Sequence, residues 1–393
     1  MFAARRRTLG EDHPDTLAAR FGVAHEMSAR GDHVGTEDMF RQVLAARQRT
    51  LGPDHPDALA TRFSIAREMA ARGEHTAAEN EFRDVFAARR RTLGEDHPDT
   101  LATRFSIAQE MAARGDHAGA EEEFRHVLAG ETRSLGPDHP GTLIARFSIA
   151  REMAARGDHT EAENEFRDLL PDLERTLGSD HPDALATRSS IAQEMAARGD
   201  HARAEAEFRD LLPYLERTLG PDHPDTLIAR FSIAQEMAAR GDHAGAEDEF
   251  RGMLPDLERT LGPDHPDTLA TRFSIAREMA ARGDHTRAEV ELRDVLPHLE
   301  RKLGPDHPVT LILWFSIARE MAARGDHAGA EDEFRDMLPH LRRRLGPDHP
   351  DTLAAVKWID YIQGEKTVDP PSQTGPGRQR SKLCSYLLRE RCS

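Results

Sequence analysis

The sequence repeats itself with a fixed period of 42 residues. The tripeptide Asp-His-Pro occurs nine times, and its histidines follow one another at this interval: His13, His55, His97, His139, His181, His223, His265, His307 and His349. A period between about 20 and 50 residues is typical of solenoids and other arrays of small units. The 393-residue chain is therefore predicted to hold about eight copies of one unit instead of several globular domains.

Each copy reads as a pair of helices. In the seventh copy, Pro266 suits the first helical position, where its missing N–H costs nothing, and Gly283 suits the position after the helix ends. The predicted first helix runs to Arg282 and is apolar around most of its circumference. A second helix begins near Asp284 or His285 and is apolar on one side only. Such a hairpin cannot bury its apolar faces alone, so stacked copies must supply the core. We expect the first helices to line an inner, concave wall.

The repeat pattern also predicts where the parts of the chain begin and end. The stretch 2–17 is identical to 86–101, so the sequence starts within a second helix, and we expect a misassigned start or a fragment of a longer protein. The predicted parts are a partial repeat at 1–13, eight repeats at 14–349, a capping helix at 350–363, a disordered linker at 364–381 and a short tail at 382–393, which holds Cys384 and Cys392.

The charge and the hydropathy of the chain exclude some classes of partner. The formal net charge of -17 argues against nucleic acid and against anionic membranes, since both require a basic surface. No window approaches the roughly 18 apolar residues of a membrane span, and the first residues lack the apolar core of a signal peptide. We therefore expect a cytoplasmic protein that binds neither nucleic acid nor a membrane.

Two series of histidines suggest chemistry at first sight. Metal ligands must converge on one ion, whereas Asp-His-Pro copies on stacked repeats lie about 10 Å or more apart. We therefore predict that these histidines cap the first helices. The second series follows the glycine between the helices and consists of His33, His75, His117, His159, His201, His243, His285 and His327. We interpret these rings as filling space between the helices, and a response of the histidines to pH remains an alternative. Because every candidate nucleophile or base is repeated as scaffold, we predict no enzymatic activity and no metal or cofactor.

The spacing of large and small side chains in the seventh copy resembles that of tetratricopeptide repeats. The residues that carry this resemblance are Ile275-Ala276, Met279, Gly283, Ala288 and Leu292. The 42-residue period and the linker "LGPDHPDTL" resemble the kinesin-light-chain type of this repeat, which also occurs in bacterial signalling proteins. The resemblance implies an all-α, right-handed solenoid whose concave groove binds a peptide or a partner protein. In bacteria, such arrays often belong to proteins with a nucleotide-binding switch domain, but the chain contains no G-x-x-x-x-G-K-[ST] phosphate loop.

One departure from this family concerns the groove. Members commonly read "TRNNLA" where this chain reads "TRFSIA", so Phe273 and Ser274 replace two asparagines that hold a partner's backbone, and a more hydrophobic ligand is expected. One turn later the residue alternates among His, Arg and Gln, which indicates either ligand selection or neutral variation at a solvated site. The candidate groove residues are Phe63, Ser64, Arg67, Phe105, Ser106, Gln109, Phe147, Ser148, Arg151, Ser190, Gln193, Phe231, Ser232, Gln235, Phe273, Ser274, Arg277, Phe315, Ser316 and Arg319.

The second helices of the later repeats contain a proline in their middle. These residues are Pro171, Pro213, Pro255, Pro297 and Pro339. Because an interior proline removes a hydrogen bond, we expect a kink or a break there. For the whole chain we predict a non-catalytic scaffold that binds a protein or peptide. The alternative is the sensor array of a larger signalling protein whose switch NTPase domain is not in this sequence.

Overall fold

The computed structural model describes residues 8–364, and these residues form helices without any strand. The first helices of the repeats are α2 (Pro14–Ser28), α4 (Pro56–Ala71), α6 (Pro98–Ala113), α8 (Pro140–Arg156), α10 (Pro182–Ala197), α12 (Pro224–Ala239), α14 (Pro266–Ala281), α16 (Pro308–Ala323) and α18 (Pro350–Ile362). The second helices are α3 (His33–Leu51), α5 (His75–Leu93), α7 (His117–Leu135), α9 (His159–Leu177), α11 (His201–Thr218), α13 (His243–Thr260), α15 (His285–Leu303) and α17 (His327–Leu345). The predicted all-α repeat architecture is thereby confirmed. The predicted linker and tail lie outside the described residues, as does most of the partial repeat.

The Asp-His-Pro tripeptide begins each first helix, as predicted. At α4, His55 is the N-cap residue, and its Nδ1 accepts a hydrogen bond of 3.1 Å from the backbone N–H of Asp57. The proline occupies the first turn, where it removes no intrahelical bond. Between the paired helices the chain turns at a glycine with positive φ, such as Gly283 at +82°, a conformation that side chains with a Cβ rarely adopt. The tripeptide is thus a helix start that recurs in every repeat.

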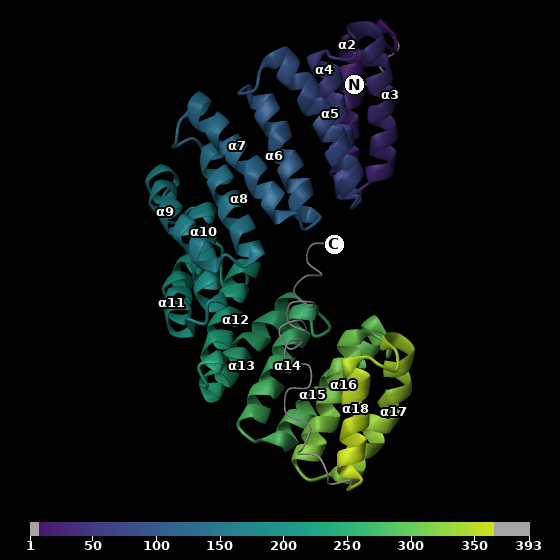
Figure 1. The fold of residues 1–393 in the computed structure, drawn as a ribbon, viewed down its shortest axis with the longest axis vertical. Helices are drawn as coiled ribbons and strands as arrows, with labels where there is room; N and C mark the ends of the chain where they lie inside the picture. The colour runs from purple at the N-terminus through teal and green to yellow at the C-terminus, as the bar shows by residue number, and fades with distance from the viewer. Residues whose placement is uncertain (1–7, 365–393) are drawn as a thin grey trace. The chain divides into compact units, whose positions relative to one another are not determined.

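The chain divides into two compact units between Arg198 and Gly199. Within the N-terminal unit, α2 to α10 follow one another in chain order, and each packs against the next (Figure 1). Within the C-terminal unit, α11 to α18 do the same. The largest fully buried side chains include one phenylalanine from most second helices, namely Phe40, Phe82, Phe124, Phe166, Phe208, Phe250 and Phe334. In the N-terminal unit the buried apolar residues form several small clusters along the array, and in the C-terminal unit one larger cluster extends from Leu269 to Ile359.

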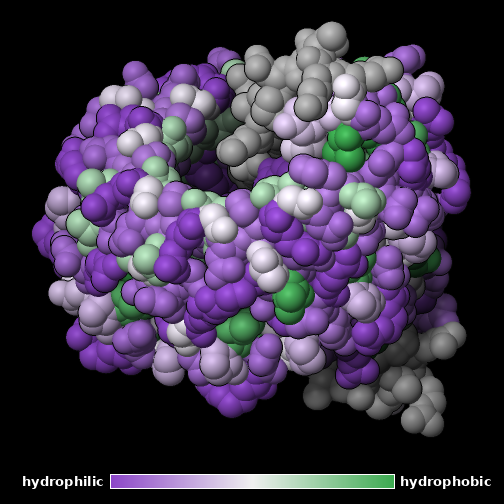
Figure 2. All heavy atoms as spheres, turned by 90° about the horizontal axis from the view of Figure 1, so that it is seen from below, coloured by the Kyte–Doolittle hydropathy of each residue, from purple (hydrophilic) through white to green (hydrophobic). Residues whose placement is uncertain are grey.

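The outer surface is largely polar. Figure 2 shows one face on which hydrophilic side chains predominate and hydrophobic ones form small, separate groups. Large hydrophobic residues with more than a third of their surface exposed are few among the described residues, and Ile144 at 48% and Val290 at 57% are two of them. An isolated exposed apolar residue is ordinary on a protein surface. Such a residue therefore indicates a binding site only where it lies in a cavity or groove.

The five interior prolines do not interrupt their helices. The helix α9 continues from His159 to Leu177 through Pro171, and α11, α13, α15 and α17 also contain their proline. Of the predicted kink or break, the break is therefore wrong, whereas the kink stays a prediction. All five rings are solvent-exposed, so water can hydrate the carbonyl that loses its N–H partner. The apolar residues on the opposite side of the helix, such as Leu169 and Leu173, stay buried.

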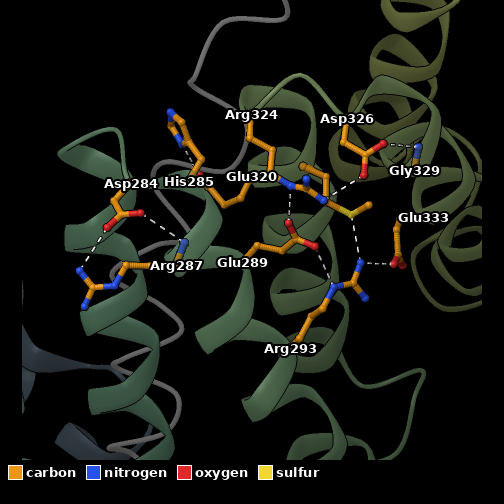
Figure 3. Close-up of polar contacts among 11 residues, drawn as sticks. Asp284, His285, Arg287, Glu289, Arg293, Glu320, Arg324, Asp326, Gly329 and Glu333 are labelled. Carbon is orange, nitrogen blue, oxygen red and sulfur yellow. Dashed lines mark hydrogen bonds and ion pairs between the residues drawn. The ribbon is translucent and has the colours of Figure 1, made fainter.

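Neighbouring repeats are joined by charged side chains at seven similar places. In Figure 3, Glu289 of α15 lies between two arginines and accepts hydrogen bonds from Arg293 Nε at 2.9 Å and from Arg324 Nε at 2.6 Å. His285 Nδ1 lies 2.8 Å from Glu320 Oε2 of the next repeat. In the N-terminal unit the corresponding histidine pairs are His33–Glu68, His75–Glu110, His117–Glu152 and His159–Glu194. Seven of the eight histidines in the second series, interpreted from the sequence as space-filling, thus bond to a buried glutamate of the following repeat.

We expect Glu289→Ala to lower the free energy of unfolding by about 2 kcal/mol. Glu289 is only 7% exposed, and hydrogen bonds to a charged, buried group contribute about 1.5–3 kcal/mol. Urea unfolding followed by circular dichroism measures the change. The control is Glu300→Ala on the same helix, a partly exposed residue for which the change should stay within about 0.5 kcal/mol. Equal effects of the two substitutions would contradict a structural role for the charged contacts of Glu289 between neighbouring repeats.

Candidate functional site

A groove runs along the first helices of the N-terminal unit. Its larger cavity has a volume of about 550 Å³. The lining residues come from α4, α5, α6, α7 and α8, and they are Phe63, Arg67, Ala70, Phe82, Ala102, Phe105, Ser106, Gln109, Glu110, Glu131, Gly141 and Ile144. Five candidate residues from the sequence, Phe63, Arg67, Phe105, Ser106 and Gln109, lie in this one cavity. The face of the first helices is thus hollowed where the sequence pattern predicts a binding wall.

The phenylalanines of the "TRFSIA" segments belong to the core as much as to the groove. The ring of Phe63 packs against Phe82 with centroids 5.1 Å apart, and Phe105 packs against Phe124 at 4.9 Å. Phe63 and Phe105 are therefore half-buried: one side supports the repeat and the other lines the cavity. Because of this double role, removing such a ring would change both stability and binding.

The serines that follow these phenylalanines use their hydroxyl protons within their own helix. Ser64 Oγ donates to the carbonyl oxygen of Ala60 at 3.1 Å, and Ser106 Oγ donates to that of Ala102 at 3.2 Å. Serine and threonine hydroxyls on helices commonly donate a hydrogen bond to the backbone carbonyl four residues earlier. Ser64 is buried and does not line the cavity, whereas Ser106 does, so the Ser106 hydroxyl offers a ligand its lone pairs and not a donor. Direct donors in the groove come from the next variable position, where Arg67 and Gln109 are exposed.

The remaining candidate residues have varied surroundings. Phe147 lines a second cavity, whereas Ser148 is buried and donates to the carbonyl of Ile144. In the C-terminal unit, Phe231, Phe273 and Phe315 are buried, Ser274 is buried as well, and Ser232 and Ser316 are partly buried. At the variable position, Arg151, Arg277 and Arg319 form ion pairs with the adjacent glutamate, Gln235 is partly buried and Gln193 is exposed. Ser190, at the serine position of its repeat, is partly buried.

The second cavity of the groove adjoins the first at Ile144. It has a volume of about 220 Å³ and is mostly apolar, and its lining residues are Pro140, Leu143, Ile144, Phe147, Leu173, Leu177, Asp183 and Ala186. Ile144 lines both cavities and is 48% exposed. Ile144 is not among the groove residues predicted from the sequence, although the equivalent residue is Ala in the preceding repeats, at Ala60 and Ala102. This change from Ala to Ile is the sequence signal that could have identified Ile144 as a groove residue.

Glu131 was also missed, and it is the most unusual side chain in the groove. Its Oε2 atom is buried and forms no hydrogen bond. Burial raises the pKa of the Glu131 carboxyl, and the nearby His139 opposes this shift. A Cβ placed on Gly141 would lie 2.7 Å from Oε2, so the carboxylate occupies the space that a side chain at 141 would fill. The groove therefore contains an acidic group without a partner for one of its oxygens.

We expect Glu131→Gln to stabilise the protein at neutral pH but not in acid. Since the folded-state pKa lies above the unfolded value, folding favours the protonated carboxyl. Stability from this group is complete below the unfolded pKa of about 4.3 and is lost as the pH rises through the folded pKa. The gain should be about 1 kcal/mol, at the low end for a buried unpaired group because Glu131 is partly exposed. Urea unfolding of both proteins at pH 4 and pH 7 measures it, and an equal difference at both pH values would contradict the account.

Two further features bear on function. Within residues 8–364 there is no cluster of three or more His, Cys, Asp or Glu side chains arranged to hold a metal ion. None of the described helices is long and apolar enough to cross a membrane. The polar residues that line the larger cavity include Arg67 and Gln109, which carry hydrogen-bond donors.

Comparisons with known proteins identify the repeat. Two models of the tetratricopeptide repeat match the chain, one at 27–91, 70–131 and 111–174 and the other at 184–225 and 232–267. Together they cover more than half of the chain. The first model covers most of the residues that line the groove, and the second model matches the repeats that follow. No curated protein matches the sequence.

Solved structures show the same fold. The apo form of the quorum sensor NprR from B. thuringiensis is 11% identical with a TM-score of 0.59, and the match covers 83% of this chain and 87% of that one. A tetratricopeptide repeat protein from Parabacteroides merdae is 15% identical with a TM-score of 0.52, covering 78% and 98%. A STAND protein with a tetratricopeptide repeat sensor from Pyrococcus horikoshii is 9% identical with a TM-score of 0.57, covering 90% and 53%. The chain belongs to the tetratricopeptide repeat family.

Proposed function

We propose that this chain is a non-catalytic scaffold that binds a peptide, or an extended segment of a partner protein, in the groove of its first helices. Tetratricopeptide repeats are protein-interaction scaffolds in general. The observation that carries the proposal here is the pair of adjoining cavities on α4, α6 and α8, which holds Phe63, Phe105, Ile144 and the exposed Arg67 and Gln109. Apolar walls with a few placed polar groups are typical of binding sites.

The groove suits an extended peptide because its features alternate along the helices. Arg67 and Gln109 lie on consecutive first helices and carry donors that fit peptide carbonyl oxygens. Between them, the half-buried Phe63 and Phe105 provide apolar contact area. The two asparagines common in the family are absent at these positions, so we assign the role of holding the ligand's backbone to Arg67 and Gln109.

Selection from a displayed library of random peptides tests the proposal. The full chain is immobilised, enriched peptides are synthesised with a fluorophore, and their affinities are measured by fluorescence polarisation. We expect the double variant Arg67→Ala/Gln109→Ala to bind about tenfold more weakly, the loss of roughly 1.4 kcal/mol of hydrogen bonding. Glu174→Gln, an exposed change on α9, is the matched control. Enrichment of no peptide, or full affinity in the double variant, would contradict the proposed groove.

A second candidate function is that of the sensor array of a larger signalling protein. This hypothesis is motivated by the structural likeness to the quorum sensor NprR and to a STAND protein with a tetratricopeptide repeat sensor. In that case the peptide would be a signal and the effector a separate domain. An in-frame phosphate-loop motif in the genomic sequence upstream of Met1 would support this candidate, and a stop codon directly upstream would contradict it.

A further inference from the structure

The third repeat departs from the first two at four positions that meet beside the larger cavity. Along the second helix and the following first helix, the first repeat has Ala46, Arg47, Asp57 and Thr61; the second has Ala88, Arg89, Asp99 and Thr103; the third has Gly130, Glu131, Gly141 and Ala145. The later repeats have a buried leucine at the position of Glu131, beginning with Leu173. Glu131 is thus the single carboxylate in this series among the described residues.

In the first two repeats this place holds an internal guanidinium. Arg89 is buried, its NH1 donates to the carbonyl oxygen of Asp99 at 3.0 Å and to Thr103 Oγ1 at 2.8 Å, and its guanidinium lies over the ring of Phe63 at 5.1 Å. Arg47 makes the same contacts in the first repeat, with Asp57, Thr61 and Phe21. The fold therefore contains a binding geometry for a guanidinium: an aromatic face, a backbone carbonyl at the start of the next first helix, and further acceptors.

In the third repeat the backbone carbonyl remains, but the threonine hydroxyl is replaced by the methyl group of Ala145 and the internal donor is absent. An ionised Glu131 has no proton to donate to the carbonyl of Gly141, the equivalent of Asp99. The ring of Phe105, the equivalent of Phe63, lines the same cavity as Glu131 and Gly141. Ala145 is smaller than the threonine it replaces, and Gly141 leaves room for the Glu131 carboxylate, whose Oε2 would lie 2.7 Å from a Cβ at 141. Glu131 adds a carboxylate whose Oε2 is buried without a hydrogen bond.

We propose that this part of the groove binds the guanidinium of an arginine from the bound peptide, with Phe105, Glu131 and the Gly141 carbonyl taking the roles that Phe63, Thr103 and the Asp99 carbonyl have for Arg89. The inference rests on the proposed peptide-binding function and specifies its ligand. A guanidinium fits better than an ammonium because it is planar, stacks on an aromatic ring and bonds a carboxylate through two N–H groups.

The neighbouring cavity specifies a second feature of the peptide. Ile144 and Phe147 provide an apolar surface directly beside the Glu131 site, because Ile144 lines both cavities. The peptide is therefore expected to carry an apolar side chain close to its arginine. A strongly negative chain, with a net charge of -17, also attracts a basic peptide at low salt.

The test compares peptides selected on the wild type with peptides selected on the variant Glu131→Arg/Gly141→Asp/Ala145→Thr. This variant gives the third repeat the residues of the second at three of the four positions and leaves Gly130 unchanged, so it is expected to fold and to carry its own guanidinium in the site. We expect arginine next to an apolar residue to be enriched on the wild type and not on the variant. Glu174→Gln should select the same peptides as the wild type.

A pair of probes that match in shape but differ in charge sharpens the result. A selected peptide is synthesised with arginine and with citrulline, its uncharged isostere. The replacement should weaken binding to the wild type about tenfold or more, whereas Glu131→Gln should bind both peptides with nearly equal affinity. Peptides that bind the groove without arginine, or a citrulline effect that is unchanged in Glu131→Gln, would overturn the arginine site while leaving the groove intact. Selection of no peptide at all would overturn both.

Discussion

Phe124→Ala should lower the free energy of unfolding by about 4 kcal/mol, the range found when a fully buried phenylalanine is removed from a core. Phe124 on α7 is completely buried and lies against Phe105 of the same repeat. Because repeats exchange contacts only with their neighbours, the loss weakens the coupling of the second, third and fourth repeats. Urea unfolding measures the total change, and hydrogen exchange should show lost protection first in α6 to α8.

The matched comparison is Phe105→Ala on the adjoining helix. Phe105 is half-buried, so its removal should cost about half as much, near 2 kcal/mol. The two substitutions should also be non-additive, because the rings are in contact. A cost for Phe105→Ala equal to that for Phe124→Ala would contradict the view that one side of Phe105 lines the groove.

Ile144→Glu should weaken peptide binding about thirtyfold while leaving stability nearly unchanged. Ile144 is the residue common to both cavities and is 48% exposed, so a carboxylate there can remain hydrated when the protein is unliganded. A bound apolar side chain would have to desolvate it, at a cost of about 2 kcal/mol. Fluorescence polarisation with a selected peptide measures the affinity, and urea unfolding measures the stability.

The control for this substitution is Val290→Glu on α15, which changes an exposed apolar residue in the C-terminal unit. It should alter neither affinity nor stability by more than a small amount. If Val290→Glu weakened binding as much as Ile144→Glu, the effect would reflect the added negative charge and not the groove.

The helical array could be predicted from the sequence because its signals are local and repeated. Each Asp-His-Pro supplies a cap and a first-turn proline, and each interhelical glycine adopts positive φ. The observed bounds of α14, Pro266–Ala281, fall one residue short of the predicted end at Arg282. Because every repeat carries the same cap residues, the helix bounds predicted for one repeat can be checked against those of the other repeats.

The site was predicted less completely, and the reasons are physical. The sequence placed Phe63 and Phe105 on the groove side, but their half-buried state depends on rings in the paired helices. The continuity of α9 through Pro171 depends on solvent exposure of that side, which no local pattern specifies. Glu131 was visible only by comparing the same position in successive repeats, where Arg89 is followed by Glu131 and then by Leu173.

Site-specific cross-linking tests the central claim most directly. A photoreactive amino acid is introduced in place of Gln109, which is exposed in the groove, and in a second protein in place of Glu174, which is exposed on α9. Each protein is irradiated with a peptide selected on the wild type. We predict that the peptide cross-links at position 109, that unlabelled peptide competes it away, and that position 174 does not react. Cross-linking at position 174 and not at position 109 would contradict binding in the groove of the first helices.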